Sequence, residues 1–359
     1  MPIINEKSEK FLFSYIDNPS PTGHEVEGQK IWLDYIKPYI DEWELDHYGT
    51  LYAVINPGME FKVVIEGHSD EISWIVNYIT DDGFIHVIRN GGTDQSIAPS
   101  KRVNIHTPKG IVKGIFGWPA IHTRKGNDSN LAATVENIFL DIGAKDKEEV
   151  EELGVHVGCV AVYEDGLTKL NNKFYVGRAL DNRMGGFCIA EVARLIKENG
   201  IKLPFSLYIV NSVQEEIGMR GAEMIANTIK PNIAIVTDVT HDTHTPLLKA
   251  KEQGSVKCGL GPVLCYAPAV HSILQSLVVS VAEEQKIPFQ RLAASRSTGT
   301  DTDAFAYSNG GVPSVLISLP LRYMHTTVET AQIEDVENVI LLIYNCLLKI
   351  QPDMKLKYF

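Results

Sequence analysis

The chain of 359 residues lacks most of the short motifs that identify a catalytic class. It contains no Gly-x-Ser-x-Gly nucleophile elbow, no Gly-Lys-Ser/Thr phosphate-binding loop and no Gly-x-Gly-x-x-Gly dinucleotide motif. Its five cysteines lie far apart and form no Cys-x-x-Cys pair, which excludes the usual thiolate zinc site and the dithiol redox motif. We interpret them as buried, reduced thiols of a cytosolic protein.

Positive charge and long apolar runs are also scarce. The 33 basic residues are outnumbered by 45 acidic ones, and the formal net charge of −12 argues against a nucleic-acid binder, whose footprint would be basic. No stretch of eighteen apolar residues exists to span a membrane, and the first residues contain no apolar run of signal-peptide length. We therefore expect a cytoplasmic protein that binds neither nucleic acid nor membrane.

The pattern of apolar segments changes twice along the chain. A strand-like segment, residues 62–65, leads into Gly67-His68, and from about residue 73 short β-rich pieces separated by glycines predominate. One helix is predicted within this region, over residues 131–140. After residue 175, helical and strand-like segments alternate, which is typical of a mostly parallel sheet with helices on both faces.

These changes predict an α/β fold with an insertion. The first strand of the sheet precedes the β-rich region and the others follow it, so one domain is interrupted by another. We predict a domain made of residues 1–72 and 172–359, with a mostly parallel sheet sandwiched by helices. Residues 73–171 are predicted to form an inserted, small β-barrel-like domain.

Candidate metal ligands follow four of the predicted strands. Val63-Val64-Ile65 leads to His68, Ile209-Val210 to Glu215-Glu216, Ile233–Val236 to Asp238, and Val315–Ile317 to His325. Ligands collect beyond the carboxyl ends of the strands in an open α/β sheet. Histidine, glutamate and aspartate delivered to one edge by separate strands indicate a metal site.

Each of these residues also has a structural explanation. A single histidine after a strand is often only hydrogen-bonded, but Asp70 lies two residues after His68 and can fix its tautomer, as expected beside a ligating histidine. Two adjacent glutamates at a strand end are costly unless cations neutralise one of them, which leaves the other free to move protons. Asp238 and Asp181 could each simply cap a turn or open a helix.

Two further segments are ambiguous. His241 and His244 follow Asp238 closely but lie in a predicted loop, where a ligand would need separate support. The run Thr298-Gly299-Thr300-Asp301-Thr302-Asp303 is either a capped helix start or a loop beside the site.

Several motifs, in this order, match a known family. The chain resembles the tetrahedral, dinuclear-metal aminopeptidases, a group that includes glutamyl and deblocking aminopeptidases and members once labelled endoglucanase. The matching motifs are Gly67-His68-Ser69-Asp70-Glu71, Asp141-Ile142-Gly143-Ala144, Gly177-Arg178-Ala179-Leu180-Asp181-Asn182-Arg183, Gln214-Glu215-Glu216-Ile217-Gly218, Thr237-Asp238, Gly299-Thr300-Asp301 and Arg322-Tyr323-Met324-His325-Thr326.

This resemblance implies a zinc-peptidase-like fold and a role for each candidate. Asp181 would bridge two metal ions, and the peptide bond after it is cis in similar enzymes. His68 and Asp238 would complete one metal position, and Glu216 and His325 the other. Glu215 would be the catalytic base, and Asp70 would orient His68. The inserted domain would pair subunits, with dimers building a dodecamer.

The implied activity is removal of N-terminal residues from short peptides with a free amino terminus. Two divalent ions can share a bridging water and lower its pKa towards about 7, and Glu215 would take its proton to give the attacking hydroxide. Zinc is the first expectation for the ions, with cobalt or manganese as alternatives. A related dinuclear amidohydrolase, such as a deacylase or dipeptidase, and a non-catalytic assembly-forming relative remain alternative readings.

The substrate pocket is the part that the resemblance leaves open. We expect its walls to come from residues 240–267 and 298–323, with Asp301 and Arg322 as substrate contacts. Asp303 stands where small residues are common in the family, which leaves specificity undecided.

Overall fold

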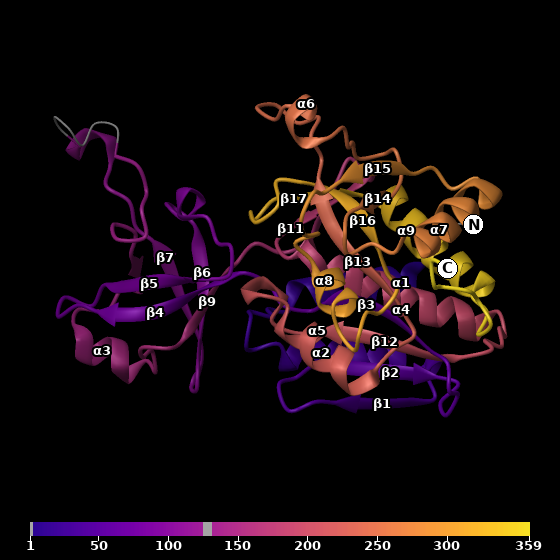
Figure 1. The fold of residues 1–359 in the computed structure, drawn as a ribbon. Coiled ribbons are helices and arrows are strands. Elements are labelled where there is room, and N and C mark those ends of the chain that lie inside the picture. The colour runs from indigo at the N-terminus through magenta and orange to yellow at the C-terminus, as the bar shows by residue number, and fades with distance from the viewer. Residues whose placement is uncertain (1–2, 125–130) are drawn as a thin grey trace.

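The computed structural model describes residues 3–124 and 131–359 of the chain. Figure 1 shows two bodies side by side: a sheet covered by helices, and a separate β barrel joined to it by extended connections. The predicted fold class, α/β with a small inserted β barrel, is confirmed. The division into domains at residues 72/73 and 171/172 stays a prediction.

The large sheet has eleven strands. Nine of them follow one another in the order β1-β2-β12-β3-β13-β16-β17-β11-β10, while β14 pairs with β16 and β15 pairs with β14. Their bounds are β1 (Glu42–Leu45), β2 (Leu51–Ile55), β3 (Lys62–His68), β10 (Thr168–Leu170), β11 (Phe174–Gly177), β12 (Ser206–Ser212), β13 (Ile233–His241), β14 (Val263–Tyr266), β15 (Gln290–Ala293), β16 (Ser314–Arg322) and β17 (Glu329–Gln332).

Parallel pairing is concentrated in the centre of this sheet. The neighbours β12, β3, β13 and β16 are parallel to one another, whereas β2, β17 and the strands beyond them pair antiparallel. Central parallel strands are covered on both faces, which explains their apolar sequences. Val63, Val64 and Ile65 of β3 are fully buried. The carboxyl ends of four parallel strands therefore meet at one edge of the sheet.

Helices cover both faces of the sheet. On one face α4 packs against β3, β12 and β13, with α1, α2 and α9 around it. On the other face α5 contacts β12, and α8 contacts β13 and β16. The helix bounds are α1 (Glu6–Asp17), α2 (Val26–Ile36), α4 (Leu180–Glu198), α5 (Arg220–Ile229), α7 (Ser272–Gln285), α8 (Asp301–Ala306) and α9 (Ile333–Lys349). Two shorter helices are α3 (Lys147–Glu152) and α6 (Ala250–Gln253).

Local sequence explains where several helices begin. The side chain of Asn5 accepts a hydrogen bond from the amide of Ser8 and so caps α1. In α9, Glu334 and Asp335 occupy the first turn and Lys349 the last, each charge opposite to the helix dipole beside it.

The barrel has its own hydrophobic core. Its six strands close in the order β4-β5-β8-β7-β6-β9, and Trp74, Ile105 and Phe116 lie in its interior, separate from the core of the large sheet. The strand bounds are β4 (Ser73–Ile79), β5 (Ile85–Asn90), β6 (Arg102–Thr107), β7 (Gly110–Phe116), β8 (Leu140–Asp141) and β9 (Val160–Tyr163). Two cores fit the expectation that a chain of this length forms more than one hydrophobic interior.

The helix predicted over residues 131–140 is wrong. This segment runs as coil and a turn into β8, and its burial alternates from residue to residue, the period of an extended chain. The Asn137 side chain bonds the backbone of Ala132 and Thr134, which offers the chain an alternative to helical hydrogen bonds. Packing onto the barrel decides the conformation here.

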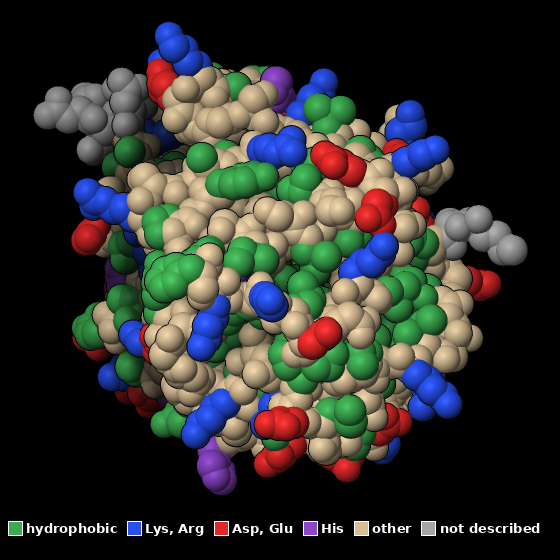
Figure 2. Space-filling view, turned by 45° about the vertical axis from the view of Figure 1, so that its right-hand side comes forward, with side chains coloured by type: hydrophobic (Ala, Val, Ile, Leu, Met, Phe, Trp, Pro, Cys, Tyr) green, Lys and Arg blue, Asp and Glu red, His purple; other side chains and the backbone are tan. Residues whose placement is uncertain are grey.

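The surface charges and the cysteines can be located in the structure. Figure 2 shows one face of the molecule, on which acidic, basic and apolar side chains are interspersed and the basic ones do not gather into a single patch. All five cysteines lie in the described part of the chain, buried and without disulfides. No helix within residues 3–124 and 131–359 is long and apolar enough to cross a membrane. The cytoplasmic location stays a prediction.

Candidate metal and active site

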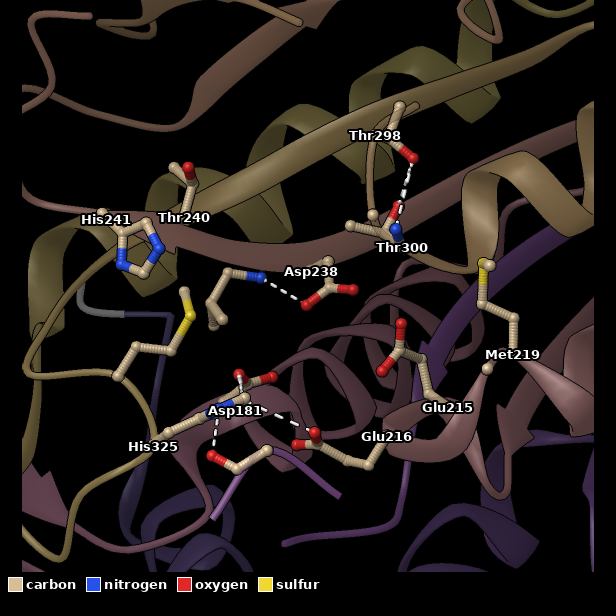
Figure 3. A pocket seen from close by; sticks show the side chains of 15 residues that line it. Asp181, Glu215, Glu216, Met219, Asp238, Thr240, His241, Thr298, Thr300 and His325 are labelled. Carbon is tan, nitrogen blue, oxygen red and sulfur yellow. Dashed lines mark hydrogen bonds and ion pairs between the residues drawn. The ribbon is translucent and has the colours of Figure 1, made fainter. Parts of the chain in front are cut away.

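Five candidate ligands predicted from the sequence converge at the carboxyl edge of the parallel strands. His68 is the last residue of β3, Asp238 lies in β13, and His325 follows β16. Glu216 belongs to a short 3-10 helix, Glu215–Ile217, that follows β12, and Asp181 lies in the first turn of α4. Figure 3 shows these side chains, apart from His68, around one cavity.

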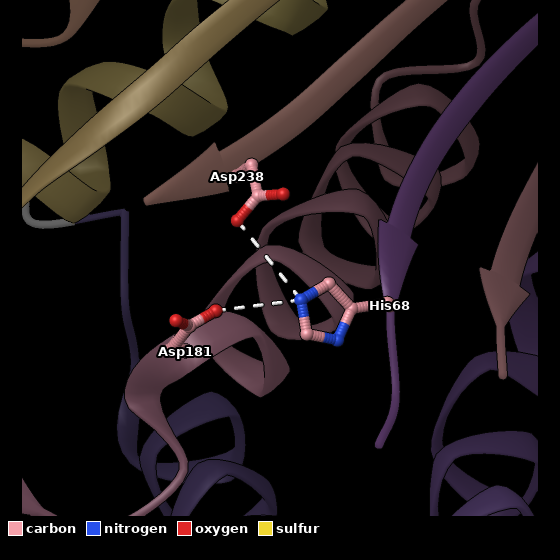
Figure 4. Close-up of side chains that lie close together, drawn as sticks. All are labelled: His68, Asp181 and Asp238. Atoms are coloured by element: carbon pink, nitrogen blue, oxygen red, sulfur yellow. Dashed lines mark ion pairs between the residues drawn. The ribbon is translucent and has the colours of Figure 1, made fainter. Parts of the chain in front are cut away.

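The first group consists of His68, Asp181 and Asp238. Nε2 of His68 lies 3.3 Å from Oδ1 of Asp181 and 4.0 Å from Oδ1 of Asp238 (Figure 4). All three residues are buried, and one ligand atom from each lies within 4.8 Å of the others. Three such atoms can hold one metal ion.

The second group shares Asp181 with the first. Nε2 of His325 lies 3.2 Å from Oδ2 of Asp181 and 3.4 Å from Oε2 of Glu216. The two oxygens of Asp181 therefore face different histidines, one in each group. This is the arrangement needed for a carboxylate that bridges two ions.

Glu215 lies beside both groups without belonging to either. Its Oε2 is 3.9 Å from Nε2 of His68, and its side chain is 13% exposed, against 5% for Glu216. Both carboxylates line the cavity, and Glu215 is the more open of the two (Figure 3).

Asp70 supports this edge through its two oxygens. Oδ1 lies 3.3 Å from Nδ1 of His68 and accepts the backbone N–H of Glu215 at 3.0 Å. Oδ2 accepts the hydroxyl of Thr22 and the N–H of Glu216. One fully buried carboxylate thus holds a histidine and the backbone of both glutamates.

Left-handed backbone conformations cluster around these residues. His325 has φ 61°, Gln214 before Glu215 has φ 57°, and Ala179, two residues before Asp181, has φ 59°. The left-handed conformation costs a residue other than glycine roughly 1–2 kcal/mol of conformational free energy. Residues held in it are found more often at functional sites than elsewhere. The peptide bond between Asp181 and Asn182 is cis, as the resemblance implied.

The electrostatics of the cavity favour bound positive charge. Burial, together with the charge of Asp181 and other carboxylates, raises the pKa of Glu215 to about 9 and that of Asp238 to about 8. Burial also raises the pKa of Glu216 well above its usual value. Burial works in the same direction on Asp181, but the hydrogen bonds from His325 and His68 outweigh it and lower its pKa. So many buried carboxylates are stable as anions only beside cations.

The donor set fits two divalent ions. Each group offers one imidazole nitrogen and two carboxylates, with Asp181 common to both. Oε1 of Glu216 is buried and has no hydrogen-bond partner among the described residues, so one ligand atom remains free. Imidazole and carboxylate donors suit zinc and neighbouring transition metals.

Two residues that sequence reasoning missed support the second group. The carboxylate of Glu329 accepts the backbone N–H of Asp181 at 3.1 Å and that of His325 at 2.7 Å. Gly92, just after the barrel strand β5, offers its carbonyl to Nδ1 of His325 at 3.1 Å. A carbonyl only accepts, so Nδ1 carries the proton and Nε2 is left to face Asp181 and Glu216. A Gly-Gly pair in the inserted region was the only sequence signal.

The ambiguous residues take different places. His241 lines the cavity, whereas Nε2 of His244 lies 3.0 Å from the hydroxyl of Ser255 and His244 is not among the lining residues. Asp303 accepts the backbone N–H groups of Thr298 and Gly299.

The two predicted substrate contacts do not line the cavity. Asp301 is 1% exposed and accepts the hydroxyl of Ser212, and Arg322 donates from Nε to Asp242. Their contact with substrate stays a prediction.

Comparison with known proteins gives one consistent family. The family described as M42 glutamyl aminopeptidase matches residues 49–342. A lysyl aminopeptidase of Pyrococcus furiosus is 31% identical over 341 residues, which cover 94% of this chain and 96% of that protein.

Solved structures agree over nearly the whole chain. A TET aminopeptidase from a marine sediment archaeon of the Thaumarchaeota superposes with a TM-score of 0.92 at 31% identity, covering 97% of this chain and 98% of that one. The TET1 peptidase of Pyrococcus horikoshii, described as assembling into a tetrahedron or a large octahedral shell, gives 0.84 at 28% identity and covers 96% and 100%.

Proposed function

Since the chain belongs to the M42 glutamyl aminopeptidase family, we propose that it releases N-terminal residues from peptides with two divalent metal ions and Glu215 as general base. The substrates would be short peptides with a free amino terminus. The observation that carries this proposal is the pair of three-residue groups that share Asp181, with Glu215 beside them at the cavity.

The two metal positions follow from the two groups. His68, Asp181 and Asp238 would hold one ion, and Asp181, Glu216 and His325 the other. Zinc is the first candidate, with cobalt and manganese as alternatives, because the donors are imidazole nitrogens and carboxylate oxygens. When bound, the ions would supply Lewis acidity at the scissile carbonyl and lower the pKa of the attacking water.

Glu215 would carry the proton. Its carboxylate would take a proton from the attacking water and return it to the nitrogen of the departing amine as the carbon–nitrogen bond breaks. Its position supports this role, because it is buried enough to exclude bulk water yet faces the cavity. The bond from its backbone N–H to Asp70 fixes it against His68. Asp70 is therefore proposed to position both the histidine and the base.

The test compares substrates with free and blocked amino termini. Protein stripped of metal and reloaded with zinc, cobalt or manganese would be assayed on aminoacyl p-nitroanilides and on N-acyl amino acids, with bound metal measured by elemental analysis. Cleavage of aminoacyl substrates with two metal equivalents per chain is expected. Cleavage of N-acyl amino acids alone would instead indicate a deacylase, and no hydrolysis with two equivalents bound would indicate a non-catalytic relative.

The inserted region is proposed to pair subunits, and the pairs to build a dodecamer. The TET1 peptidase of Pyrococcus horikoshii forms large shells. In this chain the inserted region exposes several large apolar side chains: Tyr78, Phe84, Ile88, Ile111, Ile115 and Ile121. Burial of these side chains between subunits would remove apolar surface from water and so favour pairing.

Light scattering after size-exclusion chromatography tests this assembly. The double variant Ile111→Glu/Ile115→Glu is expected to lower the mass of the particle, with its melting temperature checked against the unmodified protein. A monomeric unmodified protein would contradict the proposal.

A further inference from the structure

The wall of the cavity outside the proposed metal ligands and Glu215 carries no formal charge. The cavity has a volume of about 460 Å³, within the range of small-molecule sites. Among the described residues its remaining lining consists of Met219, Met324, Val239, three threonines, His241 and glycines. Figure 3 shows Met219 near Glu215, with Thr240 and His241 at another part of the wall.

His241 is the one further titratable group in this wall. Burial lowers its pKa below the usual value, so the ring is uncharged at neutral pH. An imidazole in this state gives a hydrogen bond but no ionic partner to a substrate carboxylate.

Three charged side chains near the cavity make other contacts, and one of them, the exposed Arg220, lies 3.3 Å from Glu223. The carboxylate of Asp303 is 7% exposed and braces the loop by accepting the N–H groups of Thr298 and Gly299. Arg322 pairs with Asp242 at 2.9 Å and is not among the lining residues. Asp303, the carboxylate that stands where small residues are common in the family, therefore stabilises the loop of the wall and does not face the cavity.

Building on the proposed function, we propose that the enzyme prefers peptides whose first residue is uncharged and apolar, of the size of methionine or leucine, over acidic or basic ones. A charged side chain entering this cavity would lose water without gaining an ionic partner, which is unfavourable for either sign. Methionine side chains are flexible and adapt to apolar groups of different shape.

This preference differs from two names among the relatives. The family is described as glutamyl aminopeptidase, and the Pyrococcus furiosus relative as lysyl aminopeptidase. A glutamyl preference needs a cation near the substrate side chain and a lysyl preference needs a free carboxylate, and the described wall offers neither beyond the ligands and Glu215.

The test measures kcat/KM of the metal-loaded protein on methionyl, leucyl, glutamyl and lysyl p-nitroanilides. We expect the two apolar substrates to exceed both charged ones by about tenfold or more. A glutamyl or lysyl substrate that equals or exceeds the apolar ones overturns the inference but leaves the aminopeptidase proposal intact. Failure on every aminoacyl substrate overturns the proposed function itself.

Charge-adding variants test the cause of the preference. Thr240→Lys and Thr298→Lys place a cation on different sides of the cavity, and Thr240→Gln and Thr298→Gln are neutral controls of similar length (Figure 3). At least one lysine variant should raise the glutamyl-to-leucyl ratio of kcat/KM about tenfold over its glutamine control. Unchanged ratios in both, with melting temperatures preserved, would show that wall charge does not set the preference.

Discussion

Replacing Gly92 by alanine should weaken one metal position and spare the other. An alanine Cβ at this position would lie 2.5 Å from Nδ1 and 2.6 Å from Cε1 of His325. To reach an ordinary contact distance of 3.4 Å, the alanine Cβ and Nδ1 of His325 must move apart by about 0.9 Å, the difference between 3.4 and 2.5 Å. Metal–nitrogen bonds tolerate only about 0.2 Å, so either the ring or the barrel segment that fixes its tautomer must move too far.

The expected magnitude follows from the loss of an orienting partner. Removing the group that holds a ligating histidine weakens metal binding by about 10–100-fold, or about 1.4–2.7 kcal/mol. Only the proposed metal position at Asp181, Glu216 and His325 should be affected. The proposed position at His68, Asp181 and Asp238 does not include His325 and should keep its affinity.

Metal analysis decides this prediction. After dialysis against a competing chelator, Gly92→Ala should retain about one equivalent where the unmodified protein retains two. Gly114→Ala, on β7 of the same barrel, is the control, because its Cβ would meet nothing closer than 3.1 Å and lies away from the site. Two equivalents of unchanged affinity in Gly92→Ala would refute the role of the barrel in holding His325.

Three further predictions concern the same site. His68→Ala should lose bound metal, which elemental analysis would detect; unchanged content would remove this residue from the ligand set. Glu329→Gln leaves one backbone N–H of Asp181 or His325 without an acceptor, at a cost of about 1–3 kcal/mol, and should lower both metal affinity and melting temperature. The control Glu191→Gln alters a buried carboxylate bonded to other partners and should lower the melting temperature alone, so equal metal loss in both variants would contradict the assignment. Chelation should lower the melting temperature of the unmodified protein reversibly, because it leaves several buried carboxylates uncompensated, and an unchanged melting curve would count against two bound ions.

The sequence was most informative where the chemistry follows from topology. Strands β3, β12, β13 and β16 are parallel, so the residues that follow them must meet at one edge. That rule brought His68, Glu216, Asp238 and His325 together before any geometry was known. The sequence pattern alone did not identify Asp181 as a ligand, because an aspartate in the first turn of a helix is as often a cap as a ligand.

Residues that act through the backbone gave little sequence signal. Glu329 holds two amides and Gly92 offers a carbonyl from a different body of the fold, so neither follows a periodic pattern. The sequence also did not predict the antiparallel strands at the margins of the sheet or the extended segment before β8. Both depend on which neighbour a strand meets, and local propensity does not contain that information.

Glu215→Gln is the most direct test of the account. The substitution keeps the size of the side chain and removes its capacity to accept a proton, while His68, Asp181, Glu216, Asp238 and His325 are left unchanged. We expect this variant to bind two metal equivalents, to keep its melting curve and to lose nearly all turnover of an aminoacyl p-nitroanilide, a fall of about 100-fold or more. A variant that binds both ions and turns over substrate at the rate of the unmodified protein would show that Glu215 is not the base.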